Sequence, residues 1–267
     1  MNKFKIKTLV DKAYADAELT KKEIVMLLKE DIDNLDYLLD KADEKRKEIC
    51  GDEVHLRAII EFSSYCNQNC FYCGLRRDNQ KLSRYQLDKK EIVETAEMAA
   101  SLGYQTVVLQ SGEDKYSAFK IAEIIEEIKK KTELAITLSL GERDFGAYKI
   151  WREAGADRYL LKHEIADQLL YEKYHPGMSY ENRIESLKYL KSLGYQIGSG
   201  VIIGLPEQTE EILAEDLLLS QKLDLDMIGS GPFIPHAETP LKDSSQGTVE
   251  MTLKFTALSR LLLPLSH

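Results

Sequence analysis

The sequence predicts an α/β fold, a TIM-like (β/α) barrel of about six βα units preceded by an N-terminal helical extension. After about residue 55, short apolar runs alternate with stretches of helical spacing. Upstream, residues 8–50 have helical spacing with solvated faces rich in Lys and Glu. We therefore divide the chain into a helical extension over residues 1–54 and a partial barrel over residues 55–267. A doubly wound open sheet is the alternative to the barrel.

Six apolar runs are expected to form the strands. They are RAIIEFSSY, TVVLQSGE, AITLSLG, RYLLKHE, IGSGVIIGL and DMIGSGPFIP. Each is followed by a stretch of helical spacing, and strands joined through helices pair in parallel. In barrels of this kind the chemistry takes place at the C-terminal ends of the strands. We therefore expect the site where these runs end.

The helices between the strands carry start and stop signals. Asp88, followed three residues later by Glu91, fits a capping box, and Gly103 fits a C-terminal stop. Apolar residues repeat on one face in residues 184–193 and again in residues 212–218. These signals predict helices that cover the outside of the sheet.

The C-terminal end departs from an eight-unit barrel. After about six units the chain ends in SRLLLPLSH, directly behind a helix, so we expect the last two barrel strands to be missing. A sheet without its neighbours has unpaired edges and an uncovered apolar face. We expect the helix TLKFTALSRLLL to be exposed at Leu258, Leu261 and Leu262. We also expect lower stability than in a form with two more βα units.

Composition restricts the class of protein. The hydrophobic fraction of 43% and the charged fraction of 30% are those of a soluble globular protein. A net charge of -9 argues against nucleic acid as the partner. We find neither an apolar run of membrane-spanning length nor a signal peptide, and we therefore expect no membrane partner and a cytoplasmic location.

Three of the four cysteines crowd into CNQNCFYC, directly behind the first strand. Cys66, Cys70 and Cys73 are a poor disulfide framework, whereas three thiolates suit an iron–sulfur cluster with one iron left open. The alternatives are a structural zinc site and chance clustering in a core. Zinc requires a second ligand pair, which neither Cys50 nor a nearby His supplies.

The spacing CxxxCxxC, with Tyr72 before the last cysteine, resembles the signature of the radical S-adenosylmethionine (SAM) superfamily. The SGE at residues 111–113 is similar to the superfamily's GGE motif, which meets the methionine amino group. GVIIG at residues 200–204 resembles the GxIxG motif beside the adenine. Five further segments resemble one family within this superfamily. They are GLRRDN, VLQSGED, TLSLGE, AGADRYLLKHE and GPFIPHAETPL. Together these resemble the [FeFe]-hydrogenase maturase family HydE, over about residues 55–263.

This resemblance implies an enzyme that reductively cleaves SAM at a [4Fe–4S] cluster to a 5'-deoxyadenosyl radical during maturation of the hydrogenase H-cluster. It implies a small-molecule or organometallic substrate and, as partners, other hydrogenase maturation proteins. Biotin synthase-like or methylornithine synthase-like chemistry is one alternative, and a non-catalytic iron–sulfur carrier is another. If the last strands are missing, we expect SAM cleavage to be poor or uncoupled from substrate.

The resemblance also implies a set of site residues. The catalytic residues and cluster ligands are Cys66, Cys70 and Cys73. The residues expected to contact SAM or substrate are Tyr72, Gln110, Ser111, Gly112, Glu113, Thr137, Ser139, Lys162, Glu164, Arg183 and Ile202.

Several of these residues have structural alternatives. Gly112 and Glu113 fit an ordinary turn with a capping acid, and Thr137 and Ser139 fit small inward-packing polar residues. Arg183 opens a helix, where the dipole does not favour a cation, and a surface salt bridge is its alternative.

The fourth strand combines charged residues in an unusual way. Lys162 and Glu164 alternate on it and are expected to point into the barrel, which is costly unless they pair or bind a ligand. Lys162 stands where the family usually has arginine, and lysine keeps the charge but loses the bidentate geometry. We expect His163 to point outward in a structural role.

Overall fold

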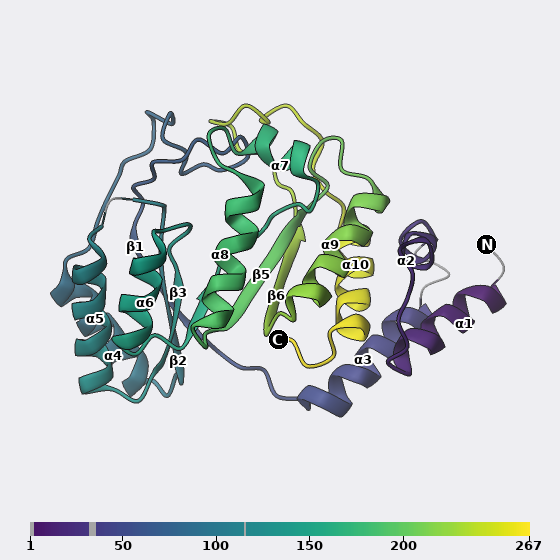
Figure 1. The fold of residues 1–267 in the computed structure, drawn as a ribbon, viewed down its shortest axis with the longest axis horizontal. Coiled ribbons are helices and arrows are strands. Elements are labelled where there is room, and N and C mark those ends of the chain that lie inside the picture. Colours follow the sequence, from purple (N-terminus) through teal and green to yellow (C-terminus); the bar gives the residue numbers. More distant parts are fainter. Residues whose placement is uncertain (1–2, 32–35, 115) are drawn as a thin grey trace.

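A computed structural model describes residues 3–31, 36–114 and 116–267. Helices and strands alternate after residue 57, as the sequence predicts, except that two helices lie between the fourth and fifth strands (Figure 1). The elements, in chain order, are α1 Lys3–Tyr14, α2 Lys21–Leu28, α3 Asp36–Cys50, β1 Ala58–Ser63, α4 Lys89–Ser101, β2 Thr106–Ser111, α5 Ala118–Lys131, β3 Ala135–Ser139, α6 Phe145–Glu153, β4 Arg158–Leu160, α7 Gln168–Tyr174, α8 Tyr180–Ser192, β5 Gln196–Ile203, α9 Glu210–Leu223, β6 Met227–Pro232 and α10 Val249–Leu262.

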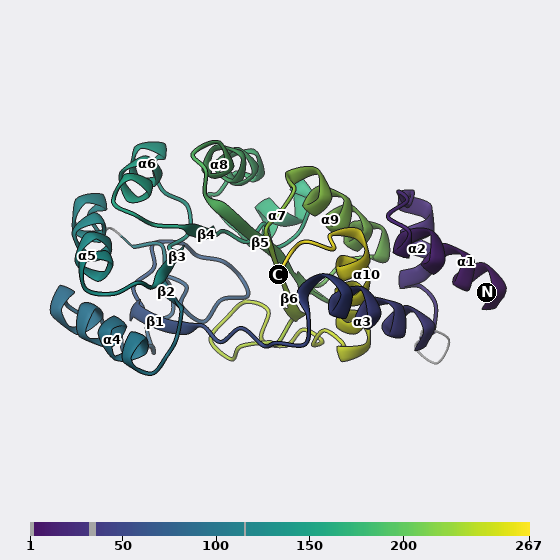
Figure 2. The same cartoon turned by 90° about the horizontal axis from the view of Figure 1, so that it is seen from below.

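Within the described residues, six strands form one sheet in the order β1-β2-β3-β4-β5-β6, and every neighbouring pair is parallel. Seen along the strands, the sheet curves as an arc with α4, α5, α6, α8 and α9 on its outer side (Figure 2). A doubly wound sheet reverses its strand order, whereas this order follows the sequence. The prediction of a TIM-like partial barrel is therefore confirmed, and β1 and β6 are the edges of the arc.

Local signals place the outer helices. At the start of α4 the Asp88 side chain accepts from Glu91 N, and the Glu91 side chain accepts from Asp88 N. Gly103 follows the end of α4 with a φ of +89°, a left-handed conformation that glycine adopts without strain. The predicted capping box and stop signal are both confirmed. They fix where α4 begins and ends between β1 and β2.

The core lies between the sheet and its outer helices and continues into the N-terminal helices. Ile121, Ile124 and Ile125 of α5 are buried against the sheet, and burying such a side chain contributes roughly 1.5–3 kcal/mol. Apolar residues of α1 and α2, including Val10 and Leu27, belong to the same cluster of buried residues. The helices of the extension lie beside α9 and α10 (Figure 1). Whether residues 1–54 form a separate domain stays a prediction.

The expectation of an exposed C-terminal helix is wrong. Leu258 and Leu261 of α10 are at most 1% exposed, and Leu262 is 9% exposed. The reason is that α10 packs against β6 and α9 of the barrel and also against α2 and α3 of the N-terminal extension, so that α10 is covered by both parts. Arg260 also ties the following segment to the helix by donating to Pro264 O and Ser266 O.

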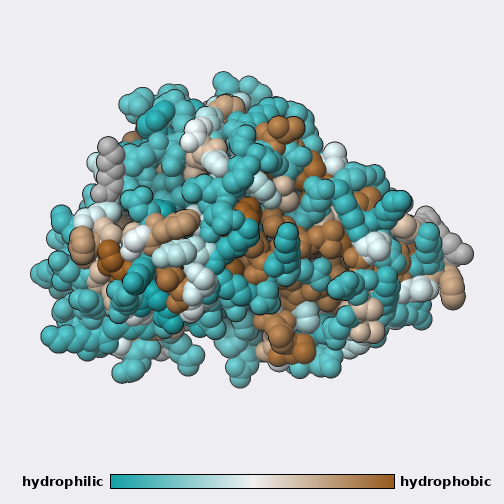
Figure 3. All heavy atoms as spheres, in the orientation of Figure 1, coloured by the Kyte–Doolittle hydropathy of each residue, from teal (hydrophilic) through white to brown (hydrophobic). Residues whose placement is uncertain are grey.

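The surface reflects this packing. On the face shown in Figure 3, apolar side chains gather where α9 and α10 meet the N-terminal helices, whereas the surface over α4 and α5 is mostly hydrophilic. Beneath this surface, residues of the extension such as Leu27 and Leu38 share one buried apolar cluster with Leu217 and Leu258, so the contact between the extension and the barrel is apolar.

The fourth strand is shorter than predicted. β4 ends at Leu160, before Lys162 and Glu164. Leu160 pairs with Gly198, and the next bridge joins Glu164 to Val201, so this side has one more residue than β5 between the two bridges. Such a bulge interrupts the alternation of side chains. The expectation that Lys162 and Glu164 alternate on a regular strand is therefore wrong, although both follow the C-terminal end of β4.

Candidate active site

The three motif cysteines lie in the loop between β1 and α4, beyond the C-terminal end of β1. All three are free and half-buried. Burial raises the pKa of each thiol, and the pKa of Cys70 is raised further by Cys73, Glu113 and Cys66. The charges of the three thiolates would repel one another, so ionising all three requires nearby positive charge. The loop therefore supplies the thiol ligands of an iron–sulfur cluster, and iron would supply the positive charge that the ionised thiolates require.

The arrangement of the ligands differs from that of a one-metal site. Among the described residues, no three His, Cys, Asp or Glu side chains converge on a position for a single metal ion. A [4Fe–4S] cluster does not need such convergence, because each thiolate binds its own iron. Cys50 lies apart from the loop, at the end of α3, where its Sγ is 3.4 Å from Arg260 Nη1. Three thiolates therefore fit a cluster whose fourth iron takes another ligand.

Arg84 holds the backbone of this cysteine loop, and the sequence analysis did not identify it. Its Nη1 donates to Ser64 O and to Leu75 O, the latter at 2.8 Å, and its Nη2 donates to Arg76 O at 2.8 Å. Carbonyl groups in a folded-back loop need such partners, because the loop has no ladder of its own. Arg84 therefore fixes the segments that flank the cysteines.

Gly112 lets the second strand approach the cysteine loop. A Cβ on Gly112 would lie 2.3 Å from Tyr65 O and 2.8 Å from Cys66 Cβ, closer than such atoms approach. The Gly112 amide also donates to Ser63 O at 3.2 Å. Glycine at this position is therefore a requirement of close packing beside the first cysteine, beyond what an ordinary turn needs.

Glu113 connects three segments at the ends of the strands. Its Oε2 accepts from Gln68 Nε2 at 2.7 Å, and its Oε1 accepts from Glu142 N at 3.0 Å. Its carbonyl accepts from Asn67 N at 2.8 Å. Gly141 makes room for it, because a Cβ there would lie 1.9 Å from Glu113 Cγ, and its φ of +70° also favours glycine. Glu113 is thus bound to the cysteine loop on one side and to the β3–α6 loop on the other.

Arg183 lies beside these carboxylates, in the first turn of α8. Its Nε is 2.7 Å from Glu142 Oε1, and its Nη2 is 3.5 Å from Glu113 Oε1. Nε also donates to Tyr171 Oη at 2.8 Å. The residue is 6% exposed, so a surface salt bridge does not describe it. The helix dipole disfavours a cation here, and two buried carboxylates offset that cost.

Tyr72 of the cysteine loop contacts a buried histidine that the sequence did not mark. Tyr72 Oη lies 2.6 Å from His175 Nε2, and the rings meet edge to face at 5.3 Å. Tyr171 lies within α7 and His175 caps the C-terminal end of that helix, while Glu142 belongs to the β3–α6 loop. The stretch TLSLGE contained Glu142, but no local pattern showed that it would reach Arg183.

Four further predicted residues lie in β2 and β3. Gln110 pairs with Ser139 across the two strands. Ser111 Oγ donates to Gly112 O at 2.7 Å. Thr137 is buried, and its Oγ1 has no hydrogen-bond partner among the described residues. A buried hydroxyl without a partner is uncommon, and a bound ligand or water can satisfy it.

Lys162 and Glu164 have fewer hydrogen-bond and ion-pair partners than the groups around Arg183. Lys162 makes no hydrogen bond or ion pair with any part of the chain that the structure describes. Glu164 Oε2 is buried and also lacks a partner there. Glu164 has a φ of +63°, which is strained for a residue with a side chain. Strain of this kind concentrates at ligand sites.

Ile202 and the glycines near it form the β5 side of the site. Ile202 is half-buried and packs in the same small apolar cluster as Phe71 and Tyr72. Two residues earlier, a Cβ on Gly200 would lie 1.8 Å from Gly229 O, so only glycine fits against β6. The predicted GxIxG stretch therefore brings an apolar side chain to the cysteine loop.

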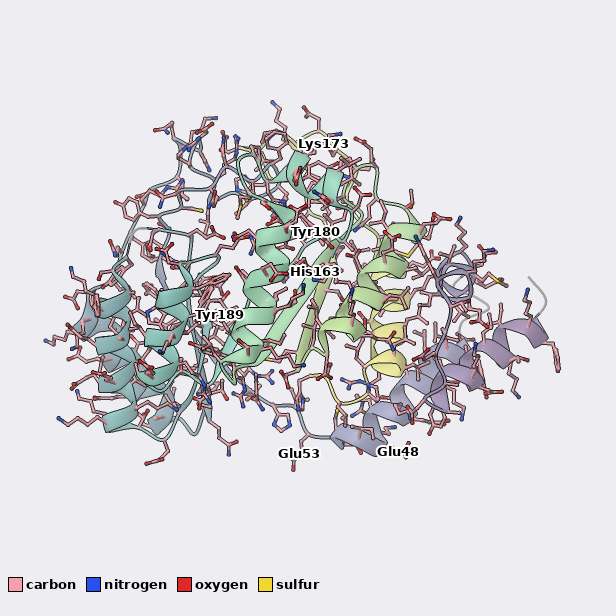
Figure 4. The ribbon with its side chains drawn as sticks, viewed as in Figure 1. Glu48, Glu53, His163, Lys173, Tyr180 and Tyr189 are labelled. Atoms are coloured by element: carbon pink, nitrogen blue, oxygen red, sulfur yellow. The ribbon has the colours of Figure 1, made fainter. Side chains whose placement is uncertain are left out.

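His163 points away from the strand ends into the layer between β5 and α9 (Figure 4). It is fully buried; its Nδ1 lies 2.8 Å from Ser199 Oγ and its Nε2 lies 3.2 Å from Asp216 Oδ1. Asp216 Oδ1 also accepts from Ala166 N at 2.6 Å. The expected outward orientation and structural role agree with these contacts.

A cavity of about 530 Å³ opens between the cysteine loop and the first turn of α8, lined by residues that include Gln68, Glu113, Glu142 and Asn182. A larger cavity of about 810 Å³ lies at the opposite end of the strands, beside Arg57 and Arg158. We place the candidate site at the smaller cavity, because Asn67 and Gln68 of the cysteine loop line it at the C-terminal ends of parallel strands.

Comparisons with known proteins agree with this geometry. The family model described as "Radical SAM superfamily" matches residues 60–219. The [FeFe] hydrogenase maturase subunit HydE of Thermotoga maritima is 53% identical over 227 residues, which cover 85% of this chain and 65% of that protein. The 3-methylornithine synthase of Methanosarcina acetivorans is 31% identical over 238 residues, covering 88% of this chain and 67% of that protein.

The fold has a close structural match as well. The crystal structure of methylornithine synthase (PylB) has a TM-score of 0.90 at 29% identity, covering 97% of this chain and 77% of that one. The chain spans about two thirds of the length of the two curated relatives, and just under two thirds of the maturase. The family match covers more than half of the 267 residues and includes all three motif cysteines. The chain belongs to the radical SAM superfamily.

Proposed function

We propose that this chain is a radical SAM enzyme that reductively cleaves SAM at a [4Fe–4S] cluster and acts in maturation of [FeFe]-hydrogenase. The observation that carries the proposal is the meeting of the cysteine loop with Glu113 and Arg183 at the strand ends. The 53% identity to the Thermotoga maritima maturase supports hydrogenase maturation as the setting.

Cys66, Cys70 and Cys73 hold the cluster in this proposal. When bound, the cluster supplies the electron that breaks a carbon–sulfur bond of SAM and yields the 5'-deoxyadenosyl radical. The protein orients the substrate and excludes water from the radical. Loss of Arg84 would disturb the loop that carries these ligands, because it supports the carbonyls on both sides of them.

The charges around Arg183 suit the amino-acid end of SAM. A carboxylate matches the guanidinium of Arg183, and an ammonium group matches Glu113. Both protein groups are held in place by neighbours, Arg183 by Tyr171 and Glu113 by Gln68. Binding therefore needs little reorganisation of these side chains, which favours affinity.

Tyr72 and Ile202 supply apolar surface next to the cysteines, which suits the adenine. Glu164 Oε2 receives no hydrogen bond from the described part of the chain, and a hydroxyl group of a ligand can provide one. Lys162 has no hydrogen-bond or ion-pair partner among the described residues and follows the end of β4, which suits an acidic substrate group. The remaining polar groups, Gln110, Ser111, Thr137 and Ser139, lie where a small-molecule or organometallic substrate would contact β2 and β3.

Product formation from SAM tests the proposal. The protein is reconstituted with iron and sulfide under anaerobic conditions, reduced with dithionite and incubated with SAM. We expect 5'-deoxyadenosine in amounts that require the cluster. A protein with a complete cluster that binds SAM but releases no 5'-deoxyadenosine would instead fit a carrier of iron–sulfur clusters.

A second candidate is methylornithine synthase-like chemistry, favoured by the TM-score of 0.90 to that enzyme. The two candidates differ in their substrates. Mass spectrometry of products formed from amino-acid and organometallic substrates separates them, since 3-methylornithine would appear only in the second case. The lower identity of 29–31% to methylornithine synthases makes the maturase the better-supported proposal.

The location of the protein and its partners are part of the same proposal. None of the helices in the described ranges has both the length and the apolar character needed to cross a bilayer. We propose that the protein acts in the cytoplasm and that its partners are other hydrogenase maturation proteins. Co-purification of the tagged chain with those proteins tests this part directly.

A further inference from the structure

The C-terminal end of α7 packs directly on the cysteine loop, although about 100 residues separate them in the sequence. Phe71 N donates to Tyr174 O at 2.9 Å, and Tyr72 Oη lies 2.6 Å from His175 Nε2. Both contacts fall between the second and third cysteines. The segment that carries two cluster ligands is therefore attached to α7 by one backbone and one side-chain hydrogen bond.

The proton positions in this contact follow from the neighbours of His175. Its Nδ1 lies 2.7 Å from Tyr171 O, a carbonyl that can only accept, so Nδ1 carries the hydrogen. Nε2 is then the acceptor and Tyr72 Oη the donor. Burial lowers the pKa of His175 to about 4, so the ring is neutral near pH 7. The Tyr171 ring stacks on the imidazole at 4.1 Å and restricts its rotation.

Tyr171 extends the connection to the charged residues. Its hydroxyl accepts from Arg183 Nε at 2.8 Å and donates to Glu142 Oε1 at 3.3 Å. The backbone and the side chain of Tyr171 thus contact residues on two different sides of the site. The carbonyl fixes His175, which holds Tyr72, while the hydroxyl fixes Arg183.

We propose that His175 and Tyr171 are positioning residues that hold Tyr72 and Arg183 at a set separation for SAM, so that α7 joins the two sides of the SAM site. The inference rests on the proposed function. Neither residue was marked by a motif, and both are almost fully buried. Their effect on SAM acts through Tyr72 and Arg183, because preorganised contacts lose less entropy when a ligand binds.

Four variants test the proposal against a matched control. Tyr72→Phe removes the donor, His175→Leu removes the acceptor, and the double variant removes both. His175→Gln restores a side-chain oxygen that can accept from Tyr72. The control is Tyr174→Phe, which also deletes a buried hydroxyl on α7 but one that donates to Pro206 O at 2.6 Å, away from Tyr72 and Arg183.

Two properties are measured in each reconstituted protein: its iron and sulfide content, and its affinity for SAM from the change that SAM causes in the electron paramagnetic resonance spectrum of the reduced cluster. We expect a full complement of iron in all variants. Tyr72→Phe and His175→Leu weaken SAM binding by about three- to tenfold each, the range of one hydrogen bond. The double variant resembles the worse single one, and His175→Gln recovers part of the loss.

The outcomes separate this inference from the proposed function. If wild-type protein with a complete cluster shows no response to SAM, the proposed function fails. If the wild type responds but both single variants bind SAM as tightly as it does, or the two effects simply multiply in the double variant, the inference is wrong. An equal loss in Tyr174→Phe also overturns it. If His175→Leu does not fold, Tyr72→Phe compared with Tyr174→Phe decides the question.

Discussion

Two buried polar clusters lie close to the same sheet, and they differ in what they can reach. The Arg183 cluster consists of Arg183, Glu113, Glu142 and Tyr171, from four separate segments. The His163 cluster consists of His163, Ser199 and Asp216, in the layer between β5 and α9. Each has a positively charged or basic group held by an acid, so composition alone does not tell them apart.

Access distinguishes the two. Glu113 and Glu142 line the cavity of about 530 Å³ beside the cysteine loop, whereas His163, Ser199 and Asp216 are each 0% exposed. A serine, a histidine and an aspartate in hydrogen-bond contact look like a hydrolytic triad, but no substrate can reach them. The comparison teaches that burial and pairing mark a stable network, and that only a cavity next to reactive groups makes such a network a candidate site.

The largest expected difference concerns the cysteines, which adjoin only the Arg183 cluster. We expect Cys66→Ala, Cys70→Ala or Cys73→Ala to abolish the SAM-responsive cluster, because each removes one thiolate ligand. Iron content and the paramagnetic spectrum of the reduced protein are measured after anaerobic reconstitution.

Cys50→Ala is the matched control, since its thiol lies at the end of α3. The Cys50→Ala variant is expected to keep a normal iron–sulfur cluster. A normal reduced cluster in any of the three motif variants contradicts the assignment, as does stoichiometric zinc in the anaerobically purified protein.

Replacing Arg183 tests the accessible cluster itself. Arg183→Gln should weaken SAM binding by about 10- to 100-fold, since a charge-assisted hydrogen bond contributes roughly 1.5–3 kcal/mol. The iron–sulfur cluster should remain, because Arg183 is not one of its ligands. SAM affinity and iron content are both measured. Unchanged affinity would show that Arg183 only balances Glu113 and Glu142.

Replacing Asp216 tests the enclosed cluster. Asp216→Ala leaves His163 Nε2 and Ala166 N without the carboxylate oxygen that both contact. We expect the free energy of unfolding to fall by about 3 kcal/mol. SAM affinity of the folded protein should not change. Denaturant unfolding measures the first quantity, and a marked loss of SAM affinity with normal stability would reverse the roles of the two clusters.

The smallest expected effect is a pH dependence of the free energy of unfolding that comes from His175. This residue contacts Tyr72 and therefore belongs with the Arg183 cluster rather than the His163 cluster. Its folded pKa of about 4 lies below the ordinary value of 6.5. As the pH falls below 6.5, the unfolded chain takes up this proton first, so the histidine's contribution to stability is lost progressively down to about pH 4. At pH 5.5 the expected loss is about 1 kcal/mol. Unfolding of His175→Gln should lack this part of the decline, and identical pH profiles would contradict the assignment.

Much of the fold could be read from local signals. The Asp88–Glu91 capping box, the stop at Gly103 and the six apolar runs act over a few residues, and each predicted strand exists in the structure. Where the expectation failed, a distant segment was responsible. α10, which carries the buried Leu258 and Leu261, packs against α2 and α3, although some 200 residues lie between these helices and α10.

The sequence by itself determined the cysteine spacing, the glycines at the strand ends and the alternation of strands and helices, because these depend on neighbours along the chain. Only the tertiary structure decided that Glu142 and Tyr171 meet Arg183, and that His175 meets Tyr72. It also decided that His163 is enclosed while Glu113 lines a cavity. The physical reason is that a hydrogen bond needs two atoms within about 3 Å, and only the packing of helices on the curved sheet brings residues so far apart in sequence to that distance.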